Sequence, residues 1–112
     1  MNGKLQTVLW AMQRASAAVL ALCVAVHLAT LVYAVRGGLS AAEILGRTRG
    51  NVAWFAFYSV FVFAVTLHVP IGLRAALGEW LGWRGASREL ALFCLAILLC
   101  VGGMRAVIGV FL

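Results

Sequence analysis

The sequence predicts an all-α membrane protein with three transmembrane helices. Three long apolar runs are separated by short connections that contain arginine, and 65% of the 112 residues are hydrophobic. Only 11% of the residues are charged and none is aspartate, whereas about 25% of the residues of a typical soluble domain are charged. A soluble fold this short has no interior large enough for so much apolar surface, so the composition fits a lipid bilayer.

Each apolar run is long enough to cross the hydrocarbon core. The first predicted span, residues 15–35, reaches about 31 Å at about 1.5 Å per residue, which is the thickness of that core. The second predicted span covers residues 52–74 and the third covers residues 89–111. The third is interrupted only by Arg105, whose long side chain can extend to the membrane surface.

The two connections carry different signals. In the first, Ser40 followed by Glu43 has the spacing of a helix capping box, which predicts a short surface helix over residues 41–46. In the second, Trp80 and Trp83 are typical of the aromatic belt at a membrane interface.

The net charge of +6 comes almost entirely from arginines at the ends of the apolar runs. This placement indicates control of membrane topology and contact with anionic lipid, and it argues against nucleic-acid binding. On the side of the N-terminus and the second connection lie Lys4, Arg14, Arg74, Arg84 and Arg88. On the opposite side lie Arg36, Arg47, Arg49 and Arg105. The excess of one cation favours a cytoplasmic N-terminus and an external C-terminus.

The only two histidines, His27 and His68, lie inside predicted spans, where ionisable groups are costly and usually functional. Each is either a neutral residue bonded to a neighbouring helix or a ligand. Ala64, Gly72 and Ala75 lie one or two turns from His68 and leave room for a flat macrocycle, or for close helix packing. An ordinary packing stripe is formed in the first span by Ala17, Ala21, Ala25 and Ala29.

The depths of the two imidazoles indicate two separate sites. His27 lies about 20 Å along the helix from Arg14, and His68 lies about 9 Å from Arg74. Because the first two spans are antiparallel, the imidazoles differ in depth by about 10 Å. The two axial ligands of one haem should lie at similar depth when the haem plane stands along the membrane normal. If both histidines are haem ligands, each is therefore expected to pair with a histidine of another chain. This predicts a larger haem-binding helix bundle with two haems per pair of chains.

The run HVPIGLR from His68 to Arg74, followed by Glu79, resembles the haem-ligand segment of a known family. That family is the cytochrome b membrane anchor of succinate dehydrogenases and fumarate reductases, the succinate:quinone oxidoreductases. Glu79 stands where aspartate is usual, and Ala75 replaces a second histidine. The run QRAS ending at Ser16 is similar to the family's Arg-and-Ser segment near the quinone pocket and the haem propionates. The resemblance covers roughly residues 13–80.

The resemblance implies a haem b-binding anchor that carries electrons between membrane quinone and an iron–sulfur and flavoprotein module for succinate or fumarate. His68 and His27 would be axial ligands of haem iron, the only metal expected. Arg14, Ser16 and Arg74 would contact haem propionates or quinone. Glu79 would assist quinone protonation or simply cap the loop.

The partners implied are an iron–sulfur subunit, a flavoprotein subunit and a second anchor chain, either identical or a sister subunit, in lipid. The expected location is the bacterial inner (cytoplasmic) membrane. This respiratory-chain subunit would have no dehydrogenase site of its own.

Two other functions stay open at this stage. One is a haem-binding anchor of a different respiratory oxidoreductase, and the other is a small membrane scaffold or assembly protein without a cofactor. Other chemistry lacks support, because there is no phosphate loop, no Ser-His-Asp set and no zinc-type spacing. The three cysteines read as small apolar residues rather than as disulfides or metal ligands: Cys23, Cys94 and Cys100.

Overall fold

The computed structural model describes residues 3–112, and over these residues the chain forms four α-helices and no strand. The helices are α1 (Gly3–Arg36), α2 (Ala41–Thr48), α3 (Val52–Trp80) and α4 (Ala86–Phe111). Three of them, α1, α3 and α4, are long and apolar enough to cross a membrane. The predicted all-α membrane fold with three spanning helices is therefore confirmed.

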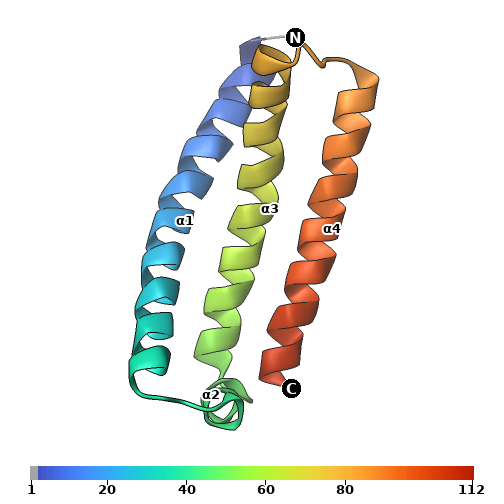
Figure 1. Ribbon diagram of the computed structural model, residues 1–112. Helices are drawn as coiled ribbons and strands as arrows, with labels where there is room; N and C mark the ends of the chain where they lie inside the picture. The colour runs from blue at the N-terminus through green and yellow to red at the C-terminus, as the bar shows by residue number, and fades with distance from the viewer. Residues whose placement is uncertain (1–2) are drawn as a thin grey trace.

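The long helices stand side by side with α3 in the middle (Figure 1). Each long helix runs antiparallel to its neighbour, so the start of α1 and the α3–α4 connection share one end of the molecule. The short helix α2 and the C-terminus lie at the other end. Because α1 and α4 pack mainly against α3 and little against each other, much of the helix surface is left open.

The helices extend beyond the predicted spans. Helix α1 begins at Gly3, well before residue 15, and α3 continues through Pro70 to Trp80. The predicted spans stopped at charged residues, where hydropathy falls. A helix does not end there, because arginine and glutamate are good helix formers and their side chains reach the interface.

Few side chains are buried within the single chain. The described residues with buried side chains are Ser16, Cys23, Ala64, Leu92 and Val107. The small-residue stripe of α1 is exposed along its whole length, at Ala17, Ala21, Ala25 and Ala29. This stripe is therefore not used for packing inside the chain, and it remains available to lipid or to another helix.

The capping box predicted from the sequence is present at the start of α2. The Ser40 hydroxyl accepts a hydrogen bond from the Glu43 backbone N–H at 3.2 Å, and the Glu43 carboxylate accepts one from the Ser40 N–H at 3.2 Å. The backbone hydrogen bond from Ser40 lowers the pKa of the Glu43 carboxyl. Two backbone N–H groups at the helix start, which have no partner within the helix, thus gain hydrogen bonds. These bonds explain why so short a helix forms.

The other end of α2 is tied to the last turn of α4. The Thr48 hydroxyl donates a hydrogen bond to the Val110 carbonyl at 2.8 Å. The Gly50 N–H donates to the Phe111 carbonyl at 2.8 Å, from a left-handed backbone conformation with φ of 68° that suits glycine. These bonds fix α2 beneath the ends of the long helices.

The α3–α4 interface is tight at Gly103. A Cβ atom placed there would lie 2.7 Å and 2.9 Å from the two γ-methyl carbons of Val62. Valine has one strongly preferred χ1 rotamer in a helix, so these methyl groups cannot turn aside easily. The two backbones can approach this closely only because residue 103 is glycine.

We therefore expect Gly103→Ala to destabilise the protein by about 1–3 kcal/mol through overpacking. Gly109→Ala, in the same helix, is the matched control because open space surrounds that position. The measurement is the thermal unfolding midpoint of both variants in one detergent. Equal midpoints for the two variants would contradict the close α3–α4 approach.

Candidate functional site

His68 lies at the α1–α3 interface beside a buried hydroxyl. Its Nδ1 atom is 3.5 Å from the Ser16 Oγ, and Ser16 is only 4% exposed. The Ser16 hydroxyl donates its proton to the Gln13 carbonyl at 3.1 Å, so its oxygen is left to accept from His68 Nδ1–H. That tautomer leaves the lone pair of Nε2 available for a ligand.

His27 has an equivalent arrangement nearer the other end of the same interface. Its Nδ1 atom is 3.1 Å from the Tyr58 hydroxyl oxygen. Tyr58 and Phe61 both meet the imidazole edge to face, with ring centroids 5.7 Å apart. The two aromatic rings and the hydrogen bond hold the imidazole orientation, and again the bond uses Nδ1 rather than Nε2.

The two imidazoles lie at clearly different depths. Ser16 marks the level of His68 on α1, and from Ser16 to His27 the helix rises about 16 Å. On α3 the rise from Tyr58 to His68 is about 15 Å. The separation is larger than the roughly 10 Å expected from the sequence, which assumed that Arg14 and Arg74 share a level. Because Ser16 meets His68, Arg74 lies further towards the membrane surface than Arg14.

A large apolar cavity opens beside His27. Its volume is about 630 Å³, and its walls come from all four helices, with Tyr58, Val65 and the small residues Gly102 and Gly103 among them. A second pocket of about 230 Å³ is also lined by His27 and Tyr58. The two hollows therefore surround one imidazole with mainly apolar walls.

A different pocket, of about 330 Å³, lies at the other end of the α1–α3 interface. It is lined by Trp10, Gln13, Gly72 and Arg74, among others. The Gln13 amide fits against α3 because residue 72 has no side chain; a Cβ there would lie 3.1 Å from Gln13 Nε2. The Gln13 Oε1 atom is buried and has no hydrogen-bond partner among residues 3–112. A buried carbonyl without a partner is costly, so this oxygen suits a ligand that donates a hydrogen bond.

The residues predicted to contact propionate or quinone are only partly brought together. Arg74 lines the pocket that contains Gln13. Arg14 instead lies over the indole of Trp10, with its Cζ atom 5.2 Å from the ring centroid. Ser16 faces His68 rather than the pocket. Arg14 and Ser16 therefore flank the pocket through their contacts with Trp10 and Gln13.

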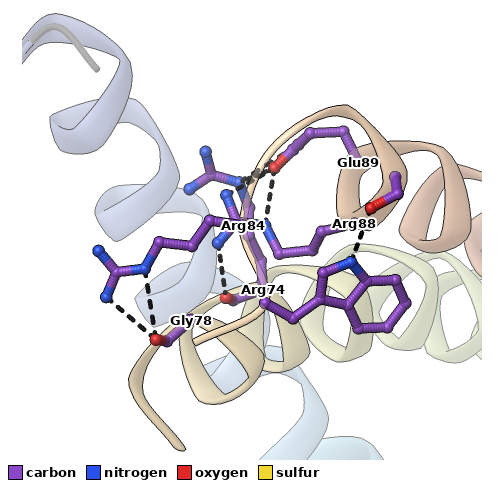
Figure 2. A network of polar contacts seen from close by, with 7 residues as sticks. Arg74, Gly78, Arg84, Arg88 and Glu89 are labelled. Carbon is purple, nitrogen blue, oxygen red and sulfur yellow. Dashed lines mark hydrogen bonds and ion pairs between the residues drawn. The ribbon is translucent and has the colours of Figure 1, made fainter. Parts of the chain in front are cut away.

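Arg74 belongs to a polar network that joins the end of α3 to the start of α4 (Figure 2). Its Nε donates to both carboxylate oxygens of Glu89, at 3.0 and 3.3 Å. Arg88 donates to Glu89 at 2.8 Å and to the Arg74 carbonyl at 3.3 Å. Arg84 donates to the Gly78 carbonyl at 3.0 Å. The network holds the Arg74 guanidinium at the membrane surface beside the pocket.

Sequence reasoning did not identify three of the residues in these sites. It considered Glu79 as the acid near Arg74, but Glu79 is exposed and the carboxylate that meets Arg74 is that of Glu89. Tyr58 and Gln13 were also missed. The aromatic run that contains Tyr58 was the available signal, but its contact with a histidine of another helix depends on the helix register.

A protein family described as the succinate dehydrogenase/fumarate reductase transmembrane subunit matches residues 1–104. The chain belongs to this family. The resemblance seen in the sequence is thereby confirmed, and the chain is a membrane anchor subunit that associates with the other subunits of a succinate dehydrogenase/fumarate reductase complex. No curated protein and no solved structure matches the chain.

The unpaired Gln13 oxygen gives a test of the pocket of about 330 Å³ that Gln13 and Arg74 line in this anchor. Gln13→Met keeps the length of the side chain and removes the buried oxygen, so we expect stability to be unchanged or to rise by about 1 kcal/mol. Gln6→Met, at an exposed position of the same pocket, is the control and should have no effect. Thermal unfolding of the purified complex is the measurement. A clear loss of stability in Gln13→Met alone would show that the oxygen has a structural partner.

Proposed function

We propose that this anchor subunit carries electrons between membrane quinone and an iron–sulfur and flavoprotein module that acts on succinate or fumarate, with b-type haems ligated by His68 and His27. One observation carries the proposal. Both imidazoles have Nδ1 beside a hydroxyl of the neighbouring helix, and each Nε2 atom can ligate iron when Nδ1 carries the proton and the hydroxyl oxygen accepts the hydrogen bond. Bound haem b would supply one-electron transfer.

The surroundings of His27 have room for a haem. The cavity of about 630 Å³ beside His27 is walled mainly by apolar side chains and glycines. Beside His68, Ala64 is small and buried, and the Gln13 amide lies against Gly72, so these two positions of α3 are already packed within the chain.

A second anchor chain, identical or a sister subunit, would complete each ligand set. The histidine levels differ by about 15 Å, so one haem standing along the membrane normal takes only one ligand from this chain. The exposed alanine stripe of α1 supports a partner helix, because small residues spaced by four permit close packing in lipid. These features support a two-haem bundle shared between two chains.

The pocket between Gln13 and Arg74 suits a quinone head group or a haem propionate. The Arg74 guanidinium and the Gln13 amide N–H groups can donate to a quinone carbonyl or to a carboxylate. The unpaired Gln13 Oε1 can accept from the hydroxyl of a quinol. Ser16 positions His68 below this pocket, and Arg14 covers its Trp10 wall.

We place the N-terminus and the α3–α4 connection on the cytoplasmic side of a bacterial inner membrane. The support is the cationic end of the molecule, where Arg74 and Arg88 pair with the single carboxylate of Glu89 and Arg84 donates to the Gly78 carbonyl (Figure 2). The soluble subunits would dock at this end, next to the Arg74 pocket.

Haem content of the purified complex tests the proposal. We expect b-type absorbance in the dithionite-reduced minus oxidised spectrum of the parent, and loss of a distinct fraction of the haem in His68→Ala and in His27→Ala. Thr66→Ala is the control, because the Thr66 hydroxyl bonds only to the carbonyl of Val62 in its own helix.

Two outcomes would count against the proposal. Loss of all haem in either histidine variant would contradict two separate sites. A parent complex without haem would contradict haem ligation and leave a scaffold without a cofactor.

A further inference from the structure

Arg47 lines the same hollow as His27. Both residues contribute to the pocket of about 230 Å³, with Tyr33, Thr48 and Tyr58 among the other walls. Thr48 and Tyr58 also line the large cavity of about 630 Å³, so the two hollows share one boundary around the His27 imidazole. Among the described residues that line either hollow, Arg47 is the only Lys or Arg.

The guanidinium of Arg47 is held near the membrane surface by an aromatic ring. Its Cζ atom lies 5.3 Å from the centroid of the Tyr33 ring, on the last turn of α1. From His27 to Tyr33, α1 rises about 9 Å. The cation therefore lies about that far from the imidazole along the membrane normal, towards the surface.

The position of Arg47 is fixed by bonds at both ends of its helix. The capping box between Ser40 and Glu43 starts α2, and the Thr48 hydroxyl ties its last residue to α4. Glu43 is the acidic residue one turn before Arg47, and its carboxylate accepts the Ser40 N–H. The guanidinium carries five N–H donors and Tyr33 offers a single hydroxyl oxygen to accept from them, so N–H groups remain to bind an anion.

We propose that Arg47 binds the propionate carboxylates of the haem ligated by His27. This inference rests on the proposed function of the chain. Haem is an apolar disc with two carboxylates on one edge. The cavity of about 630 Å³ beside His27 has mainly apolar walls, and Arg47 lines the adjoining pocket of about 230 Å³, which shares His27, Thr48 and Tyr58 with that cavity. Carboxylates left unpaired near hydrocarbon are costly, and a guanidinium fork is their best partner.

The arginines expected from the sequence to hold propionates cannot serve this site. Arg14 lies about 20 Å from His27 along α1, and Arg74 lies beyond the level of His68. Both are at the opposite end of the molecule, near the Gln13 pocket. A haem beside His27 therefore needs a cation at the α2 end, and the geometry points to Arg47.

The test uses the whole complex prepared from haem-deficient cells and titrated with two probes, haem b and its dimethyl ester, in which both carboxylates are esterified. The absorbance fraction that His27→Ala removes identifies the site. We expect Arg47→Gln to weaken haem b binding at that site about tenfold, the scale of one hydrogen bond to a charged group, and to leave ester binding unchanged. Arg47→Lys keeps the charge and should retain most of the affinity.

Arg49→Gln is the matched control. It removes the same charge just after the same helix, but Arg49 does not line either hollow. Equal haem b affinity in Arg47→Gln and Arg49→Gln would overturn the assignment while leaving the proposed function intact. Equal weakening of haem b and ester by Arg47→Gln would also overturn it, because the effect would then not involve the carboxylates. A parent complex that binds no haem would instead overturn the proposed function, and this inference with it.

Discussion

The register of α1 against α3 is the constraint on which both histidine sites depend. Ser16 meets His68 across this interface, and His27 meets Tyr58 across it about 15 Å away. Within the hydrocarbon there is no water to satisfy a ring nitrogen, so the hydroxyl must come from the neighbouring helix. A slide of one helix by a single turn, about 5.4 Å, would separate both pairs at once.

The parts of this structure that could be predicted from sequence are those set by local pattern or by the bilayer. The three spans follow from hydropathy because hydrocarbon thickness dictates their length, and the Ser40–Glu43 capping box follows from spacing alone. The Arg74–Glu89 pair and the His27–Tyr58 contact could not be predicted, because each joins two helices whose register is set by packing. The two histidines themselves were found because imidazoles are rare inside a membrane.

The chain has very little interior of its own. A row of helices with α3 in the middle buries few side chains, and surfaces such as the alanine stripe of α1 remain uncovered (Figure 1). In lipid this exposure carries no hydrophobic penalty, so helix packing depends on close van der Waals contact and polar bonds. The fold of one anchor chain is therefore coupled to the subunits around it, and its stability is a property of the complex.

The bonds from Thr48 to Val110 and from Gly50 to Phe111 have a consequence for biogenesis. They join the end of α2 and the turn that follows it to the last turn of α4. The wall that α4 contributes to the hollow around His27 therefore forms only after α4 has been inserted. Because α4 follows the other three helices in the chain, it is the last of the four to reach this hollow, and its Gly102 and Gly103 complete the wall.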